Sequence, residues 1–276
     1  MIEGFQYFPK PFACLRLFPR MLLILGCLLI LLTGCSKSDS EDDAFKGMTA
    51  KQIFSEAETA LADEDYSKAT RYYEALDAMY PFSQYSQQGL MDSIYAYYEN
   101  DDVALASATA DRYIHLYPRS PHVDYAYYMK GLANFEQARG ALAKVLPFDT
   151  SQRDPGTQKE AYADFSLLVE RYPNSAYAPD ARQRMVFLRN LFAQSELNAA
   201  EFYMGRKMYV AAANRASYLI ENYPQAPQTE KALVILINAD QSLGLKQAAA
   251  NAFDVLKATY PNSKALKKLH LDEKSS

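Results

Sequence analysis

Five Tyr-Pro pairs occur along the chain, and each closes a stretch with helical periodicity. They are Tyr80-Pro81, Tyr117-Pro118, Tyr172-Pro173, Tyr223-Pro224 and Tyr260-Pro261. Twelve residues before each of these prolines stands an alanine: Ala69, Ala106, Ala161, Ala212 and Ala249. The residues eight before are Tyr73, Ala110, Phe165, Ala216 and Phe253, and those five before are Leu76, Tyr113, Leu168, Leu219 and Leu256. Matches at fixed offsets predict a structural repeat, and helical repeats usually bind other molecules.

The offsets have a simple physical meaning. Positions 12, 8 and 5 before the proline are three or four residues apart, so they form one stripe on a helix. The alanine lets a neighbouring helix approach, the larger residues fill the gap between helices, and proline ends the helix. Two residues after four of the prolines comes a serine that we expect to cap the next helix: Ser83, Ser120, Ser175 and Ser263.

This pattern resembles the tetratricopeptide repeat, a helix pair of about 34 residues. It predicts an all-α superhelical solenoid of five tetratricopeptide-like helix pairs. Two of the repeat intervals are longer than this unit. In repeat three the breaker-rich segment 139–154 predicts an inserted loop between helices at 121–138 and 155–172. From Ala178 to Arg206 no proline follows Pro179, which predicts one long connecting helix of about 40 Å.

The N-terminus predicts export and lipid attachment. An apolar run from Met21 to Leu32 follows Lys10, Arg16 and Arg20 and is too short to cross a bilayer comfortably. It ends in Leu32-Thr33-Gly34-Cys35, which resembles the lipobox of bacterial lipoproteins. The resemblance implies a signal peptide over 1–34, with Met21 as a second candidate start, and N-palmitoyl and S-diacylglycerol groups on Cys35. The residue after Cys35 is Ser36 and not the aspartate that is associated with retention in the inner membrane. By this family rule the lipid anchor lies in the outer membrane and the protein faces the periplasm.

Charge and composition narrow the function. Removing residues 1–34 takes away three positive charges and one negative charge, so the net charge moves from −4 to about −6. An acidic chain disfavours nucleic acid as a partner. Cys35 would be the sole mature cysteine, which excludes an intrachain disulfide. The polar, acidic residues 35–49 predict a flexible tether.

No catalytic or metal-binding constellation occurs in the sequence. His115 and His122 lie on opposite sides of Pro118, so they cannot ligate a metal from one helical turn, and His270 lies far away in the sequence. Acidic groups such as Asp101 fall in predicted turns. We therefore expect no enzyme activity, no metal and no cofactor.

Aromatic residues suggest a binding surface. The chain has 22 Tyr and 14 Phe but no Trp. Packing between helices accounts for many of them, yet Tyr80, Phe82 and Tyr85 flank the first Tyr-Pro turn. Tyr97 and Tyr98 are adjacent on a helix and cannot both face one core. We expect a Tyr-lined concave groove on the first two repeats that receives an apolar or aromatic peptide.

Several segments go beyond a generic repeat. Together they resemble the BamD (YfiO/ComL) family of lipoproteins of the β-barrel assembly machine, over effectively the whole mature chain. The segments are residues 80–88, 94–98, 124–125, 128–132, 153–155, 172–175, 186–188 and 200–203. The run at 80–88 and Arg153-Asp154-Pro155 are the specific ones.

The resemblance implies a non-enzymatic assembly factor. Its first repeats (50–138) would bind the C-terminal signal of unfolded outer-membrane proteins, and its last repeats (155–276) would dock on the POTRA domains of BamA. The matching positions for substrate are Lys68, Tyr80, Phe82, Ser83, Tyr85 and Tyr203, and the matching position for BamA is Arg215. The family also binds the lipoproteins BamC and BamE.

Two other interpretations stay open on these residues. A pilotin-like repeat lipoprotein for secretin and pilus assembly would share the lipobox and the repeats, as would a periplasmic cell-envelope scaffold. The pilotin-like interpretation does not predict the Arg-Asp-Pro insertion or the Ser-Gln-Gln run. Tyr80 is equally well explained by packing at a helix end.

Overall fold

The computed structural model describes residues 44–139 and 156–269. The chain divides into two units, residues 1–48 and 49–276. Of the first unit only 44–48 are described, and they end in a turn. Cys35, most of the predicted tether and nearly all of the predicted inserted loop lie outside the described residues.

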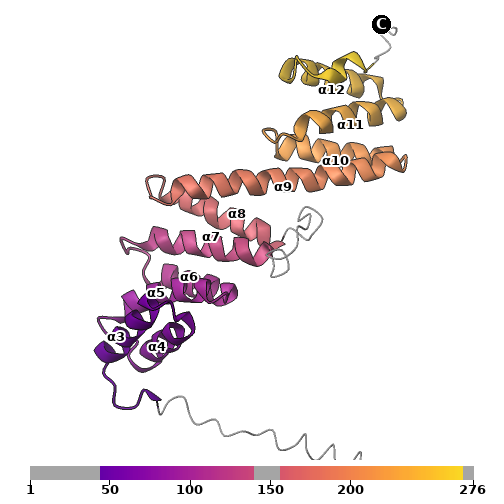
Figure 1. Cartoon of the computed structure of the whole chain (residues 1–276). Helices are drawn as coiled ribbons and strands as arrows, with labels where there is room; N and C mark the ends of the chain where they lie inside the picture. The colour runs from indigo at the N-terminus through magenta and orange to yellow at the C-terminus, as the bar shows by residue number, and fades with distance from the viewer. Residues whose placement is uncertain (1–43, 140–155, 270–276) are drawn as a thin grey trace, which may run out of the picture. The chain divides into compact units, whose positions relative to one another are not determined.

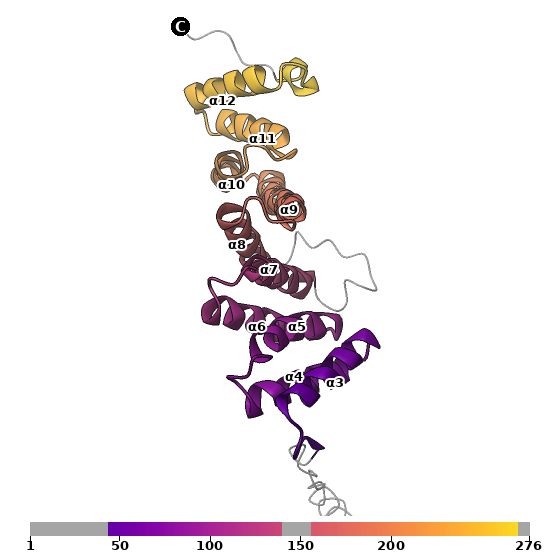
Figure 2. The ribbon, with the colours of Figure 1, turned by 90° about the vertical axis from the view of Figure 1, so that its left-hand side faces the viewer.

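The second unit consists of helices that pack in chain order (Figures 1 and 2). The described residues of this unit contain ten α-helices, one short 3₁₀ helix and no strand. Successive helices form five pairs, which confirms the predicted all-α solenoid. The pairs are α3 (Ala50–Ala62) with α4 (Tyr66–Met79), α5 (Ser86–Glu99) with α6 (Val103–Leu116), α7 (Val123–Arg139) with α8 (Gly156–Arg171), α9 (Ala178–Gly205) with α10 (Tyr209–Asn222), and α11 (Thr229–Ser242) with α12 (Lys246–Thr259), followed by η4 (Lys264–Lys267).

The repeated stripe forms the core of every pair. The five stripe alanines are buried, and so are the five residues that lie five before the prolines. Each second helix ends at the Tyr-Pro pair, where the tyrosine amide donates to the carbonyl four residues earlier, as from Tyr80 to Leu76 at 2.9 Å. The packing predicted from the offsets is therefore confirmed.

The serines after the prolines do not cap α-helices, contrary to our expectation. The amide of Ser83 donates to the carbonyl of Tyr80 at 3.1 Å, and its Oγ accepts from the amide of Tyr85 at 3.3 Å. Tyr85 itself stands at the N-cap of α5 without a side-chain cap. The proline is followed by an extra turn, so the serine lies one turn too early. Ser263 is the exception among these serines and caps η4.

The turn inside four of the pairs contains a residue in the left-handed conformation. These residues are Glu64 (φ 58°), Asp101 (φ 67°), Lys207 (φ 59°) and Gly244 (φ 74°). In each turn the next amide reaches back to close the first helix, as from Met208 to Tyr203 at 3.0 Å. Only one of the four is glycine, so the shared geometry could not be predicted from residue type alone.

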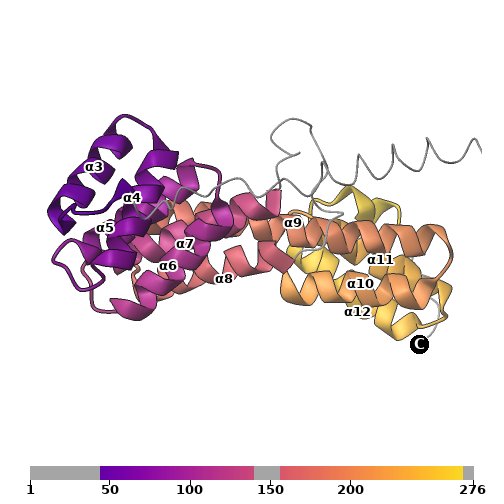
Figure 3. The same cartoon turned by 90° about the horizontal axis from the view of Figure 1, so that it is seen from below.

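Helix α9 spans 28 residues with Pro179 in its first turn, and the predicted long connecting helix is confirmed. It lies beside α8 at one end and α10 at the other (Figures 1 and 3). Leu188 and Phe192 join the core of the first repeats, whereas Ala193 and Leu197 join the core of the next ones. One helix thus belongs to two cores, and the boundary falls between two adjacent residues.

Candidate functional site

A cavity of about 310 Å³ opens along the first helices of the N-terminal pairs. We call it the N-terminal groove. Its lining comes from α3, α5, the start of α7 and the residue before α9. The lining residues are Leu61, Gln88, Met91, Asp92, Tyr95, His122, Tyr125 and Tyr177.

Helix α5 supplies the floor because of its periodicity. Gln88, Asp92 and Tyr95 follow each other at four and three residues, so they lie on one face of the helix. Another face carries Gly89, where an added Cβ would lie 2.7 Å from Cδ2 of Leu76 on α4. Glycine lets α4 and α5 approach closely and leaves the polar face of α5 to the groove.

Tyrosine rings form the far wall. The rings of Tyr125 and Tyr177 lie 5.6 Å apart, and Tyr128 stacks on Tyr177 at 4.8 Å. The hydroxyl of Tyr128 donates to Asp180 at 2.8 Å, and burial together with this carboxylate raises the pKa of Tyr128 to about 12. The phenol of Tyr128 therefore stays neutral. The tyrosine rings offer flat apolar faces with polar rims, which suits an aromatic or apolar segment of another chain.

A carboxyl group with an altered pKa lies on the floor. The side-chain amide of Gln88 donates to both oxygens of Asp92 at 2.9 Å. Burial and, secondarily, the nearby Glu58 raise the pKa of Asp92 to about 7. Glu58 also accepts a hydrogen bond from the hydroxyl of Tyr73. Near neutral pH Asp92 can therefore either accept a hydrogen bond from a peptide N–H or, once protonated, donate one to a carbonyl.

Four of the predicted substrate residues cluster in the turn between α4 and α5. Phe82 is 99% exposed. Tyr80 ends α4, and its carbonyl accepts from Ser86 Oγ at 2.6 Å. Ser83 Oγ lies 2.8 Å from the same hydroxyl. The ring of Tyr85 stacks on Phe54 of α3 at 5.2 Å. The turn adjoins the groove in sequence, since α5 starts directly after Tyr85.

Lys68 and Tyr203 lie away from this turn. Lys68 is in the first turn of α4, roughly 18 Å along the helix from Tyr80. It lies 3.7 Å from Glu56 and 5.6 Å from the ring centre of Tyr72. Tyr203 lies near the end of α9, roughly 39 Å along that helix from Tyr177. The described residues therefore do not bring the predicted substrate set together as one site.

Arg215 is already paired within the chain. Its guanidinium donates to Glu196 of α9 at 3.1 Å, and its side chain is about half exposed. A partner carboxylate would have to share or replace Glu196.

Most of the groove lining was not predicted from the sequence. Asp92, Tyr125 and Tyr177 come from three different repeats, and only stacking brings them together. The available signal was the polar stripe of α5 opposite its buried residues.

No group of three His, Cys, Asp or Glu within 44–139 and 156–269 could hold a metal ion. In the same part of the chain no helix has both the length and the apolar character to cross a bilayer.

A protein-family model and similar proteins from other organisms agree on one family. The family model YfiO, described as an outer membrane lipoprotein, matches residues 46–256. A protein from Vibrio cholerae named outer membrane protein assembly factor BamD is 43% identical over 220 residues, covering 80% of this chain and 90% of the relative. A protein of the same name from Xylella fastidiosa is 37% identical over 247 residues, covering 90% and 84%.

Two solved structures illustrate the comparison with known folds. The TPR2AB domain of yeast Sti1, in complex with pHSP90, is 13% identical and covers 78% of each chain with a TM-score of 0.42. The type IV pilus biogenesis factor PilW is 16% identical and covers 91% of this chain and 94% of its own, with a TM-score of 0.33.

Proposed function

The chain belongs to the YfiO family of outer membrane lipoproteins, and we propose that it holds unfolded outer-membrane proteins in its N-terminal groove while its last repeats dock on BamA. Its general role is in outer membrane protein assembly, as the names of its relatives state. It acts as a holder of other polypeptides and not as an enzyme. The anchor is a lipid on Cys35, which keeps it at the periplasmic face of the outer membrane, and BamC and BamE are further partners.

The observation that carries the substrate role is the N-terminal groove. Its walls are tyrosine rings, its floor has a carboxyl group that can accept or donate, and Phe82 in the turn that precedes α5 is fully exposed. Aromatic stacking with a few main-chain hydrogen bonds is how grooves recognise extended peptides without strict sequence demands.

A peptide-binding experiment tests this role. The probe is a fluorescein-labelled peptide from the last strand of an outer-membrane barrel, ending in an aromatic residue, followed by anisotropy. Tyr95→Ala should weaken binding about tenfold, because it removes an aromatic ring from the floor of the groove. Tyr218→Ala removes a similarly exposed tyrosine from α10 and should leave binding unchanged. Equal effects of the two variants would remove the groove from the proposal.

The docking role depends on Arg215, and Glu196 provides a matched control. Arg215→Glu and Glu196→Gln both break the internal ion pair, but only the first removes the guanidinium. We expect Arg215→Glu to reduce co-purification of BamA from detergent-solubilised membranes and Glu196→Gln to preserve it. If both variants lose BamA equally, the pair supports the fold of the repeat instead. Cys35→Ser should abolish incorporation of labelled palmitate, and persistent label would refute the lipobox.

A further inference from the structure

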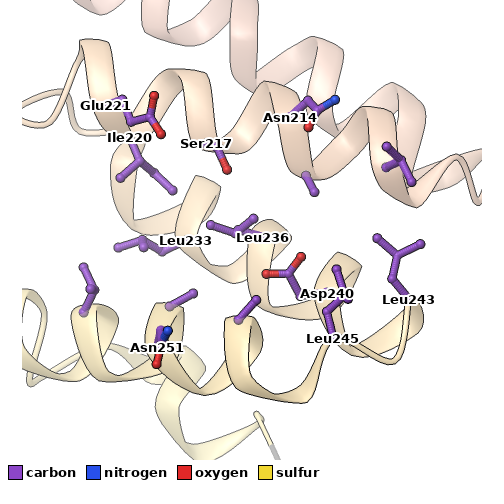
Figure 4. Close-up of a pocket in the computed structure, with 15 residues that line it drawn as sticks. Asn214, Ser217, Ile220, Glu221, Leu233, Leu236, Asp240, Leu243, Leu245 and Asn251 are labelled. Atoms are coloured by element: carbon purple, nitrogen blue, oxygen red, sulfur yellow. The ribbon is translucent and has the colours of Figure 1, made fainter.

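A second hollow lies in the last two repeats and differs from the N-terminal groove in chemistry. It has a volume of about 520 Å³. Helices α10, α11 and α12 line it, with α11 in the middle (Figure 4). We call it the C-terminal groove. Its apolar lining includes Val210, Leu233, Leu236, Leu245 and Val255.

Among its 15 lining residues are two acidic side chains and no basic one. Glu221 lies on α10, and Asp240 lies on α11 among leucines (Figure 4). Asp240 is 6% exposed. Within the described residues its carboxyl group has neither a hydrogen bond nor an ion pair. Burial therefore raises its pKa.

A carboxyl group that is flanked by apolar side chains and loses part of its hydration is stabilised by a cationic partner. The N-terminal repeats show the contrast. There Asp164, which is equally buried, accepts from Asn134 at 2.6 Å and lies 3.5 Å from the ammonium of Lys130. In the described part of the chain no basic side chain lines the C-terminal groove, and Asn214 and Asn251, which do line it, make no hydrogen bond to Asp240. A cationic donor from outside the chain would therefore pair with it.

The rim of the groove indicates how large the occupant is. Val210, Leu245 and Val255 are each about half exposed or more, so apolar surface extends beyond the hollow itself. The stretch of α10 from Val210 to Glu221 is roughly 16 Å long, about three helical turns. A segment of another protein fits this length better than a single small molecule does.

We propose that the C-terminal groove binds an apolar helical segment of a partner protein and that one Lys or Arg of this segment pairs with Asp240. The apolar walls supply contact area, and the carboxyl group selects the register of the segment. The site is separate from Arg215, because Arg215 pairs with Glu196 on α9 while the adjacent Asn214 lines the groove. The proposal therefore stands or falls independently of docking through Arg215.

A pair of labelled peptides tests the proposal on the full mature chain. Each is a capped leucine–alanine helix of about 15 residues, with either Lys or norleucine at its centre. We expect the Lys peptide to bind the wild type at least about tenfold more tightly, and Asp240→Asn to remove this preference. Asp254→Asn makes the same charge change at an exposed position of α12 outside the groove and should retain it. Equal affinity of the two peptides for the wild type would overturn the proposal.

A second pair of variants keeps the test independent of the carboxyl group. Ala248 is exposed and lines the groove, so Ala248→Phe should block both peptides without disturbing the core. Ala258→Phe places the same ring on α12 outside the groove and should bind normally. If the Lys peptide binds Ala248→Phe as well as the wild type, the groove is not its site. Self-association that Ala248→Phe abolishes would assign the groove to a second copy instead and overturn the proposal.

Discussion

The first three repeats and the last two are built on the same stripe, yet their interiors differ in chemistry. In the first three, polar groups reach the core and find partners: Tyr97 donates to Glu74 at 2.6 Å, and Lys130 lies 2.6 Å from Asp111. In the last two, the core is mainly alanine, leucine and isoleucine. The stripe fixes how closely helices pack, whereas the other faces decide what each groove can bind.

The largest expected effect is on the aromatic core. Phe165 is fully buried, while the equivalent position in repeat four is Ala216. Phe165→Ala should lower the free energy of unfolding by about 3–5 kcal/mol, because it leaves a cavity. Urea denaturation measures the loss, and hydrogen exchange should show it mainly in α7, α8 and the start of α9. Equal loss of protection in α11 and α12 would mean that the two interiors do not unfold separately.

The next largest effect concerns the space that the ring of Phe165 needs. At Gly131 an added Cβ would lie 2.6 Å from the ring of Phe165. Gly131→Ala should therefore destabilise the chain by about 1–3 kcal/mol in the same assay. Gly205→Ala is the control, since nothing lies within 4 Å of its added Cβ. It should be neutral or slightly stabilising, and a loss as large as that of Gly131→Ala would contradict the steric explanation.

The carboxyl group of Asp92 in the N-terminal groove should make the free energy of unfolding depend on pH. The folded pKa of Asp92 is raised to about 7, so between roughly pH 4 and 7 the folded state holds a proton that the unfolded state has lost. Stability from this group falls as pH rises through that window. Asp92→Asn should raise the free energy of unfolding at pH 8 by about 1–2 kcal/mol and much less at pH 5. A gain that is the same at both values would refute the titration.

The smallest effect should come from the left-handed turns. Lys207→Gly removes a strained conformation and should stabilise repeat four by about 0.5 kcal/mol. Asp101→Gly should stabilise its repeat less than Lys207→Gly does, because aspartate tolerates the left-handed conformation better than lysine. Thermal denaturation of both variants gives the order, and a larger gain at Asp101 would reverse the expectation.

The sequence predicted what depends on local spacing. The stripe, the Tyr-Pro helix ends and the span of α9 follow from periodicity and proline, and each is confirmed. The serine caps failed because the chain makes a further turn after Pro81 before α5 begins. The groove lining was missed because residues such as Asp92 and Tyr177 meet through stacking of separate repeats, which no single window of sequence records.

The shared membership of α9 has a practical consequence for anyone dividing this protein into fragments. Phe192 serves one core and Ala193 the other. An upstream fragment that ends before Ala178 lacks the helix that covers α8. A downstream fragment that begins after Gly205 lacks the helix that packs against α10. Neither boundary yields two intact pieces, so a study of one half in isolation should carry the whole of α9.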